Sequence, residues 1–402
     1  MVEGMRDIGV VGLGVMGFDI AFLYAMRGYR TIAYDASAAV MASCTDRREK
    51  IIERLKRRGK ISDSEIENVR DRLRASPDLK GMAGLDFVTE AVSEVAKTKM
   101  SVYKALREIG FAGILTTNTS SFPRHALLAS GSYERQKFAT THFFNPVLYT
   151  QMVELVKGDM EEISFNSTLS FLKSLGRNPV ETRDISGFVS NSILMYYAVM
   201  ALHLLQRGDR IDEIDQTAKQ MGLLPPFVSF DSWKPSIVED VTQVMFQMRG
   251  DKFLRSSKLL PVLAQRNPGF YIERKPNPEI YLWVGERRHA PGEATMKSAL
   301  KASIHVAAAR IVELGEDPAK VDFISVEGLR IPQGPLREMD RIGPATVLEE
   351  LQRISREMPD SELTPPRILT AMANEGQTFY KNNQANPWLL SYSRRESADA
   401  CH

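Results

Sequence analysis

The chain has 402 residues, which is long enough for two or three domains that each bury a core of their own. Its 43% hydrophobic and 25% charged residues are ordinary for a soluble globular protein, and its net charge of +2 gives no electrostatic case for a nucleic-acid partner. Two cysteines, Cys44 and Cys401, predict no disulfide framework, and no apolar stretch approaches the roughly 18 residues of a spanning helix. We therefore expect a cytoplasmic protein with no membrane partner, no cleaved signal and no metal site.

The first predicted element is an apolar strand, Asp7–Val11, which leads into the pattern G-x-G-x-x-G at Gly12, Gly14 and Gly17 and then into a helix from Phe18 to about Arg27. Gly12 allows the tight turn from strand to helix, Gly14 lets the backbone approach a pyrophosphate, and Gly17 permits close packing of the helix on the strand. The pyrophosphate of a dinucleotide would lie at the helix N-terminus, where free N–H groups and the helix dipole favour an anion.

A second predicted strand, Thr31–Tyr34, ends at Asp35, which lies 18 residues after Gly17. That is close to the spacing at which a carboxylate accepts a hydrogen bond from the ribose 2′-hydroxyl of a bound dinucleotide. A carboxylate at this position repels the 2′-phosphate of NADP, so the expected cofactor is NAD. The alternative is a glycine turn in an α/β protein that binds no nucleotide.

Strands and helices alternate in the first part of the chain, which predicts a largely parallel sheet covered by helices. Five further strands are expected, at Phe87–Thr89, Ile114–Thr117, Phe138–His142, Val153–Val156 and Pro179–Thr182.

An unusually long insert lies between Asp35, at the end of the second predicted strand, and Phe87, at the start of the third. Within it, Ala38–Lys60 and Asp63–Ala75 are predicted as two charged amphipathic helices broken at Gly59. We expect the two helices to form an antiparallel pair that projects from the sheet.

After Asp184 the pattern becomes helical. Phe188–Arg207 is a very apolar helical stretch, and a stretch from Arg266 to Glu293 that is rich in Pro, Gly and charge is interpreted as a linker or long connection. The expected fold class is an α/β Rossmann-like N-terminal domain with a helical-pair insert, followed by all-α C-terminal domains. The predicted domains are residues 1–184 (NAD-binding), 185–290 (helical) and 291–390 (a second, related helical domain).

A faint internal repeat underlies this division. Gly208 and Gly315 are 107 residues apart in similar segments, and so are Asp215 and Asp322. This pattern is typical of two related helical domains in tandem. The alternative is chance similarity between two helical segments.

One histidine stands out as a candidate acid–base group. His142 ends a predicted strand, begins the sequence H-F-F-N-P, and is followed twelve residues later by Glu154. In a doubly wound sheet the chemistry lies at the carboxyl ends of the strands. A carboxylate that reaches the second ring nitrogen would hold the imidazole in one tautomer and let it act as a general base. The alternative is a packed structural histidine beside two phenylalanines.

A polar run, T-T-N-T-S-S at residues 116–121, follows another predicted strand. It is either a Ser/Thr helix cap before Phe122 or a set of hydroxyl and amide groups that face the nicotinamide and the substrate.

Six stretches in order resemble the L-3-hydroxyacyl-CoA dehydrogenase family: GVVGLGVMG with its following Asp, DFVTEAV, ILTTNTSS, HFFNPVLYTQMVELV, GRNPVETRDISGFVSN and GDRIDEID. The resemblance covers about residues 6–235 and returns in weaker form over about 297–380. The pairing of N-T-S-S with H-F-F-N-P is far more specific than the glycine pattern.

The resemblance implies a role for seven further positions. The catalytic histidine of the family falls on His142 and its orienting glutamate on Glu154, while the residues that contact the substrate fall on Ser120 and Asn191. Asn145 and Asn118 would line the same site, and Glu90 would lie near the nicotinamide end.

The implied activity is NAD-dependent oxidation of an L-3-hydroxyacyl-CoA to the 3-ketoacyl-CoA, or the reverse, as in the β-oxidation of fatty acids. His142 would take the 3-hydroxyl proton while C3 gives a hydride to the nicotinamide. Glu154 would accept the other imidazole N–H and stabilise the imidazolium. Ser120 and Asn191 would orient the reacting oxygens.

The chain departs from the family pattern near the substrate. The family usually has Pro before the G-F pair and Arg after the Asn, where this chain has Ser186 and Ser192, and Trp233 stands where a small turn is expected. Two other readings therefore stay open. One is an NAD-dependent dehydrogenase of a free 3-hydroxy acid or of a carrier-protein thioester. The other is a dinucleotide-binding protein with no turnover.

The resemblance implies that short members of the family form dimers, in which the helical domains of the two subunits pack against each other. A second helical copy in the same chain could occupy the place of the twin, so we expect a monomer with internal pseudo-symmetry rather than a homodimer.

Overall fold

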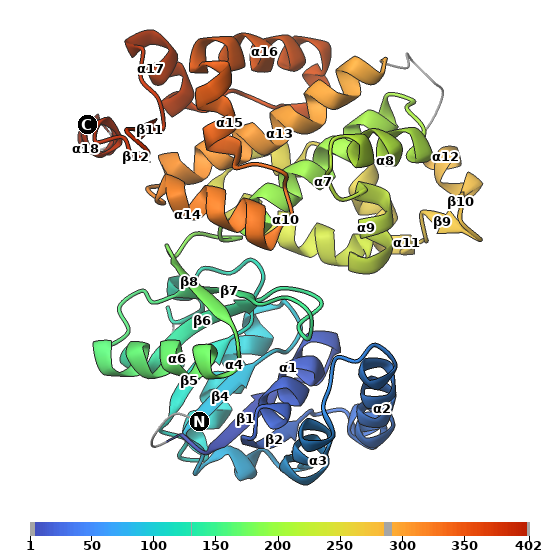
Figure 1. The fold of residues 1–402 in the computed structure, drawn as a ribbon, viewed down its shortest axis with the longest axis vertical. Coiled ribbons are helices and arrows are strands. Elements are labelled where there is room, and N and C mark those ends of the chain that lie inside the picture. The colour runs from blue at the N-terminus through green and yellow to red at the C-terminus, as the bar shows by residue number, and fades with distance from the viewer. Residues whose placement is uncertain (1–4, 130, 285–291, 400–402) are drawn as a thin grey trace. The chain divides into compact units, whose positions relative to one another are not determined.

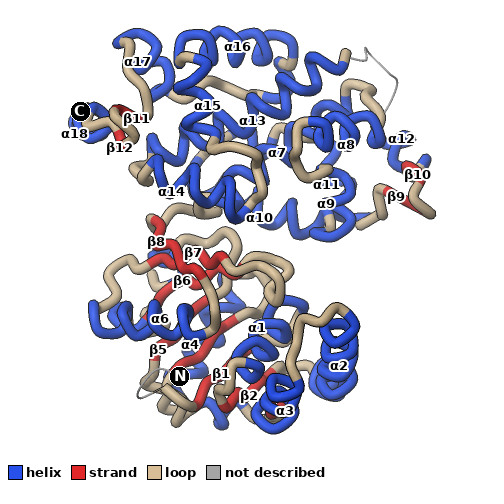
Figure 2. The backbone as a smooth tube through the Cα atoms, in the orientation of Figure 1, coloured by secondary structure: helices blue, strands red, loops and turns tan. Residues whose placement is uncertain are grey.

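The computed structural model describes residues 5–129, 131–284 and 292–399, and it divides into two compact units after Asp184. The first unit, residues 1–184, contains one large sheet with helices on it, and the second, residues 185–402, is largely helical (Figures 1 and 2). This confirms the expected fold class. Cys401 lies outside the described residues.

The sheet of the first unit has eight strands in the order β3-β2-β1-β4-β5-β6-β7-β8. All neighbouring strands are parallel except β6 and β7, which are antiparallel. The strands are β1 Asp7–Val11, β2 Arg30–Tyr34, β3 Leu73–Ala75, β4 Phe87–Glu90, β5 Ile114–Thr117, β6 Phe138–Phe143, β7 Met152–Val156 and β8 Asn178–Thr182. Every predicted strand is present, with ends that differ by at most one residue.

Helix α1 is Val15–Met26, and it begins three residues earlier than predicted, directly after Gly14. It is buried nearly throughout, so it has no polar face that would have marked its start. An aromatic cluster joins it to the sheet: the ring of Phe171 lies 5.0 Å from that of Tyr24 and 4.6 Å from that of Phe87. The remaining helices of the sheet are α4 Ala96–Glu108, α5 Arg124–Leu127 and α6 Glu162–Ser174.

The insert after β2 contains the two predicted helices, α2 Ala38–Arg57 and α3 Asp63–Arg72, which lie beyond β2 in Figure 1. The break at Gly59 is confirmed, because this residue has φ +60°. The predicted end of the second helix is wrong. Leu73–Ala75 is the edge strand β3, and it pairs in parallel with β2. The strand forms because the side chain of Leu73 is buried and because residues 73–75 pair with β2, which lies far away in sequence.

The helices of the second unit are α7 Ser190–Gln206, α8 Ile211–Gln220, α9 Pro226–Trp233, α10 Pro235–Arg249, α11 Leu259–Arg266, α12 Pro278–Val284, α13 Glu293–Glu313, α14 Pro318–Phe323, α15 Pro335–Ile342, α16 Pro344–Glu357, α17 Arg367–Glu375 and α18 Trp388–Asp399. The start of α7 corrects the prediction, since Gly187 and Phe188 have φ +75° and +50° and cannot belong to a helix.

The stretch predicted as a connection, Arg266–Glu293, contains secondary structure. Strands β9 Tyr271–Ile272 and β10 Lys275–Pro276 form a small hairpin, and α12 follows it. Asp231 holds the hairpin by accepting hydrogen bonds from the backbone N–H groups of Phe270 and Tyr271. These bonds span about 40 residues of chain, so the local composition carries no sign of them. Residues 285–291 lie outside the described part of the chain.

The second unit contains two sets of equivalent contacts. The carboxylate of Asp215 accepts hydrogen bonds from the N–H groups of Phe227 and Val228 and from the hydroxyl of Tyr271. The carboxylate of Asp322 likewise accepts hydrogen bonds from the N–H groups of Leu336 and Arg337 and from the hydroxyl of Tyr380. Tyr380 begins a second hairpin, β11 Tyr380–Lys381 and β12 Gln384–Ala385.

Asp340 continues this equivalence, because it binds the N–H groups of Phe379 and Tyr380 as Asp231 binds those of Phe270 and Tyr271. Both sets belong to one compact unit. The division into two domains at 290/291 stays a prediction, because that boundary lies outside the described residues.

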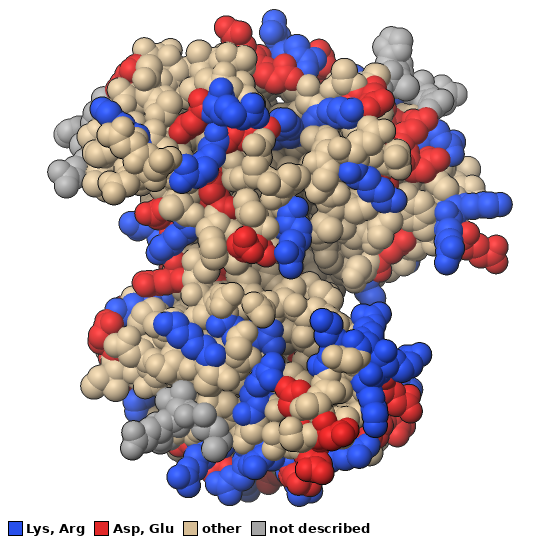
Figure 3. Space-filling view, in the orientation of Figure 1, with Lys and Arg blue, Asp and Glu red and all other residues tan. Residues whose placement is uncertain are grey.

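None of the described helices combines the length and the apolar character that a membrane crossing requires. Basic and acidic side chains are interspersed over the face drawn in Figure 3.

Candidate active site

The glycine turn lies at the carboxyl end of β1, beside the point where the strand order reverses between β1 and β4. Ligands of open α/β sheets bind at such a point. Gly12 has φ +91°, and a Cβ there would lie 2.6 Å from the backbone nitrogen of Val92. A Cβ on Gly17 would lie 1.8 Å from the carbonyl oxygen of Gly12, whereas one on Gly14 would meet nothing within 4 Å. The turn is therefore closely packed at Gly12 and Gly17 and open at Gly14, as an approaching pyrophosphate requires.

Asp35 ties this turn to the end of β2. Its Oδ2 atom accepts a hydrogen bond from the N–H of Leu13 at 2.7 Å, and its Oδ1 atom accepts one from the N–H of Ser37 at 2.8 Å. Arg47, from α2, donates to the carbonyl oxygens of Leu13 at 2.6 Å and Gly14 at 3.0 Å. The carboxylate predicted to bind a ribose is thus held at the glycine turn itself.

His142 and Glu154 face each other across the antiparallel strands β6 and β7, where they are direct register partners. The Nδ1 atom of His142 lies 2.9 Å from Oε2 of Glu154. Glu154 is fully buried and His142 is 7% exposed. A buried carboxylate that accepts the Nδ1–H leaves Nε2 as the nitrogen that can exchange a proton with a ligand.

Asn118 links the ends of β5 and β6 next to this pair. Its Oδ1 atom accepts a hydrogen bond from the N–H of Phe143 at 3.0 Å, and its own N–H donates to the carbonyl oxygen of Glu90 at 2.8 Å. Asn145 is exposed in the loop after β6. The structure therefore brings Asn118 and His142 to the same edge of the sheet as the glycine turn.

Glu94, a residue that the sequence did not single out, organises the polar run after β5. Its Oε1 atom accepts hydrogen bonds from the N–H of Ser120 at 2.8 Å, from both the N–H and the hydroxyl of Ser121 at 2.8 and 2.7 Å, and from the hydroxyl of Thr119 at 2.5 Å. Burial alone would raise the pKa of Glu94, but Lys99 and these hydrogen bonds lower it. The run is not a side-chain helix cap, because α5 begins after Pro123 with no such cap.

Glu90 lies at the carboxyl end of β4, and its carboxylate binds protein groups. Its Oε1 atom lies 2.9 Å from Nζ of Lys99, and its Oε2 atom accepts hydrogen bonds from the hydroxyls of Tyr103 and Thr117 at 2.7 Å each. Lys99 is fully buried, and although burial would lower its pKa, Glu90 and Glu94 raise it. This buried network, Glu90, Glu94 and Lys99, fixes the ends of β4 and β5.

Asn191 belongs to the second unit, in the first turn of α7. The loop before it is held by Arg249, whose Nη2 atom donates to the carbonyl oxygen of Ser186 and, at 2.6 Å, to the hydroxyl of Ser192. Burial and the nearby charge of Arg310 lower the pKa of Arg249 to about 9. The Ser192 hydroxyl and the backbone carbonyl of Ser186 therefore bind one guanidinium, that of Arg249, which the sequence did not single out.

Among the described residues, no three His, Cys, Asp or Glu side chains gather in a way that could hold a metal ion. The features that are present suit a dinucleotide-dependent oxidoreductase, since an open turn at the switch point has room for a pyrophosphate and a buried imidazole–carboxylate pair is a suitable acid–base group.

Comparison with known proteins gives the family. The family model for "3-hydroxyacyl-CoA dehydrogenase, NAD binding domain" matches residues 7–185, and the model for "3-hydroxyacyl-CoA dehydrogenase, C-terminal domain" matches residues 187–272 and 298–385. The chain belongs to the 3-hydroxyacyl-CoA dehydrogenase family. It is an oxidoreductase of that family, and its cofactor is NAD.

Relatives agree with this assignment. The hydroxyacyl-coenzyme A dehydrogenase of Rattus norvegicus mitochondria is 30% identical over 235 residues, 56% of this chain and 74% of that protein. A probable 3-hydroxybutyryl-CoA dehydrogenase of Deinococcus radiodurans is 31% identical, over 64% of this chain and 94% of that protein. The crystal structure of 3-hydroxybutyryl-CoA dehydrogenase from Escherichia coli K12 has the same fold, with a TM-score of 0.76 at 20% identity over 92% of this chain and 99% of that one.

Proposed function

We propose that the chain oxidises an L-3-hydroxyacyl-CoA to the 3-ketoacyl-CoA, and catalyses the reverse reduction, with His142 as the general acid–base group and Glu154 as its partner. The observation that carries this proposal is the buried contact of 2.9 Å between Nδ1 of His142 and Oε2 of Glu154 at the carboxyl edge of the sheet. When bound, NAD accepts the hydride that leaves C3 of the substrate.

The role of His142 in oxidation is to take the proton of the 3-hydroxyl group on Nε2. The imidazolium that results is stabilised by the carboxylate of Glu154, which accepts the Nδ1–H and is shielded from water. In the reduction the same imidazolium returns the proton to the developing alkoxide. Such a positioned group contributes about 10²–10⁴-fold to the rate.

Orientation of the substrate is assigned to Ser120, Asn191, Asn118 and Asn145. Glu94 supports this role for Ser120, because it fixes the backbone of Ser120 and Ser121 through two N–H donors. Arg249 supports the role of Asn191 in the same way, because it binds Ser186 before Asn191 and Ser192 directly after it. Holding reacting groups in this manner lowers the entropy cost of reaction.

The cofactor contacts are assigned to Gly12, Gly14, Gly17 and Asp35. Glu90 acts less directly: its carboxylate is engaged by Lys99, Tyr103 and Thr117, so it fixes the strand end near the nicotinamide.

A substrate panel with NADH tests the proposal. We expect oxidation of NADH with acetoacetyl-CoA or a longer 3-ketoacyl-CoA, and a much lower kcat/KM with the free 3-keto acid. Preference for the free acid, or for the thioester of an acyl carrier protein, would contradict the assignment of a CoA thioester as substrate. The assignment of a dehydrogenase activity would stand. Binding of NAD with no turnover of any of these compounds would contradict catalysis.

The chain is proposed to act as a monomer. The matching contacts of Asp215 and Asp322 support two equivalent halves within one helical unit, so a partner subunit is not needed to complete the pair. Light scattering should give a mass near 45.2 kDa, and a mass near twice that value would contradict the proposal.

A further inference from the structure

Arg47, on the helical insert, reaches back to the glycine turn. The residue belongs to α2, and its guanidinium donates from Nη1 to the carbonyl oxygen of Leu13 at 2.6 Å and from Nη2 to that of Gly14 at 3.0 Å. Its Cζ atom lies 4.2 Å from the centre of the buried Phe18 ring, and a cation over an aromatic face is attracted to it. Three contacts therefore hold the half-buried Arg47 side chain against the turn.

These two hydrogen bonds fix the direction of two peptide groups. The carbonyl of Leu13 shares its peptide with the N–H of Gly14, and the carbonyl of Gly14 shares its peptide with the N–H of Val15. In a trans peptide the C=O and the N–H point in opposite directions, so both N–H groups point away from Arg47. Val15 begins α1, where N–H groups have no partner within the helix. An anion on the side of the turn opposite Arg47 therefore meets both donors.

Gly14 is the open position of the turn, and this restraint acts directly on it. A Cβ at this position would meet nothing within 4 Å, and glycine adopts more backbone conformations than any other residue. The preceding peptide is tied by Asp35, which accepts a hydrogen bond from the N–H of Leu13 at 2.7 Å. Asp35 and Arg47 together therefore fix three successive peptide groups, those that carry the N–H groups of Leu13, Gly14 and Val15.

We propose that Arg47 is a positioning residue for the cofactor. It keeps the N–H groups of Gly14 and Val15 directed at the pyrophosphate of NAD, so the affinity for the dinucleotide depends on a side chain of the helical insert. The inference rests on the proposed assignment of the glycine turn to NAD. It gives α2 a part in cofactor binding, because one of its arginines binds the turn from behind.

Binding of NADH is the direct measurement. Arg47→Met keeps an apolar stem beside Phe18 and removes both donors. Fluorescence titration should give a Kd for NADH about 10- to 100-fold above that of the wild type, which is the effect of losing a hydrogen bond to a charged group. Arg47→Lys keeps the charge but has a single donor atom, so it should recover only part of the affinity. A wild-type Kd in either variant overturns the inference.

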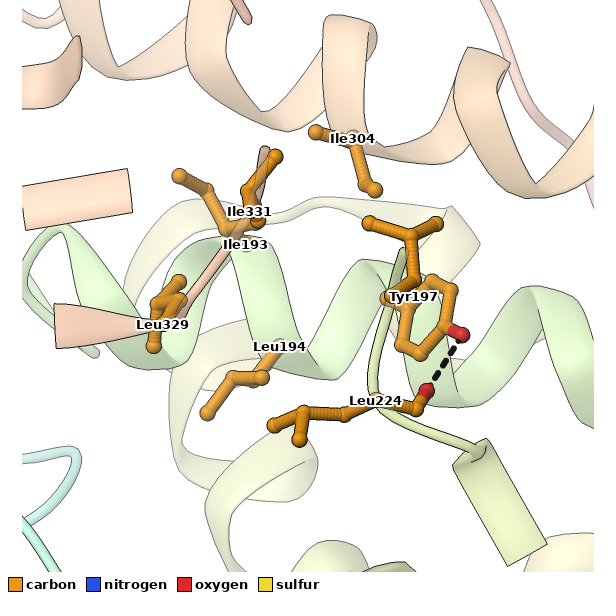
Figure 4. A pocket seen from close by; sticks show the side chains of 8 residues that line it. Ile193, Leu194, Tyr197, Leu224, Ile304, Leu329 and Ile331 are labelled. Atoms are coloured by element: carbon orange, nitrogen blue, oxygen red, sulfur yellow. Dashed lines mark hydrogen bonds between the residues drawn. The ribbon is translucent and has the colours of Figure 1, made fainter. Parts of the chain in front are cut away.

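Two control variants accompany this measurement. Lys56→Met removes an exposed cation from the same helix and should bind NADH as the wild type does. Ile304 lines a small apolar pocket between α7 and α13 of the second unit, together with Tyr197 and Leu224 (Figure 4). Ile304→Val removes one buried methylene and lowers the stability, and it should leave the Kd unchanged. A rise in the Kd of either control as large as that in Arg47→Met overturns the inference.

Salt separates positioning from a simple attraction between the guanidinium and the pyrophosphate. At about 1 M salt, exposed charges more than about 3 Å apart are largely screened. The hydrogen bonds from Arg47 to Leu13 and Gly14 do not depend on such long-range attraction. The ratio of the Kd of Arg47→Met to that of the wild type should therefore stay well above one at high salt. A ratio that falls to one overturns the positioning role.

Turnover gives a second readout. In the reduction of a 3-ketoacyl-CoA, the KM for NADH should rise in Arg47→Met as the Kd does, while kcat at saturating NADH hardly changes. The reason is that Arg47 acts on the turn, whereas the proposed proton exchange takes place at His142. An unchanged KM with a lower kcat overturns the inference.

Gly14→Asp tests the assignment on which the inference rests. A side chain fits at this position, since a Cβ would meet nothing within 4 Å, and its carboxylate would repel the pyrophosphate. Loss of NADH binding in Gly14→Asp, with weakened binding in Arg47→Met, is the expected result. Loss in Gly14→Asp alone overturns the role of Arg47 and leaves the proposed cofactor site. Wild-type binding by folded Gly14→Asp overturns that site and the inference with it.

Discussion

Nδ1 of His142 and Oε2 of Glu154 lie 2.9 Å apart across the antiparallel strands β6 and β7, and both side chains are almost wholly buried. In the proposed mechanism the carboxylate holds one imidazole tautomer and stabilises the imidazolium once it forms. The proposed chemistry depends on this pair.

Glu154→Gln keeps the shape of the pair and removes its charge. We expect kcat to fall about 10- to 100-fold in both directions, because a hydrogen bond to a charged group contributes about 1.5–3 kcal/mol. Steady-state kinetics measure the effect in the wild type and in this variant. The control is Glu67→Gln, at an exposed position on α3. Equal turnover of Glu154→Gln and the control would show that the carboxylate does not assist.

Asp35→Asn tests the cofactor preference. Removal of the negative charge removes the repulsion of a 2′-phosphate, which at about 4 Å amounts to about 1–4 kcal/mol near a surface. The ratio of kcat/KM for NAD to that for NADP should therefore fall by about tenfold or more. Asp46→Asn, an exposed aspartate of α2, is the matched control. The ribose role of Asp35 is wrong if the ratio stays that of the wild type.

Lys99→Met tests the buried network behind the site. The substitution leaves the buried carboxylate of Glu90 and that of Glu94 without their cation, and breaking a buried pair in this way costs about 3–5 kcal/mol. Urea denaturation should detect this loss. Lys97→Met, an exposed neighbour on the same helix, should stay within about 0.5 kcal/mol of the wild type. A loss no greater than that of the control contradicts the structural role of Lys99.

Glu338 should make the stability of the second unit depend on pH. Burial would raise its pKa, but hydrogen bonds from His305 at 3.1 Å and Lys301 at 2.7 Å lower it to about 2. A carboxyl group whose pKa is lower in the folded state stabilises the protein above its ordinary pKa and loses this effect as the pH falls.

The expected result concerns the difference in free energy of unfolding between wild type and Glu338→Gln. That difference should shrink as the pH is lowered from about 4.5 towards 2. Glu349→Gln, on an exposed residue, should give a small difference that hardly changes. A Glu338→Gln difference that is constant over this range would contradict the shifted pKa.

Local patterns predicted most of the first unit. The glycine spacing and the apolar strands depend on neighbours in sequence. Glu154 lies twelve residues after His142 on the next predicted strand, and the resemblance to the family is what led us to expect the two as partners. The helical pair of the insert followed from its charged periodicity and from Gly59.

Long-range contacts account for what the sequence did not reveal. Leu73–Ala75 became an edge strand through pairing with β2, and the hairpin after α11 depends on Asp231, about 40 residues earlier. Glu94 and Arg249 lie in no motif, and their importance comes from hydrogen bonds to distant loops. Glu90 and Glu94 lie nine and five residues before Lys99, and both precede helix α4, so helical spacing carries no sign of this charge network.

The most direct test of the account is the turnover of His142→Gln with a 3-ketoacyl-CoA and NADH. The account predicts that kcat falls by about 10²–10⁴-fold while binding of NADH hardly changes, because the imidazole exchanges the proton and does not hold the dinucleotide. Turnover near that of the wild type in the folded variant would contradict the central claim.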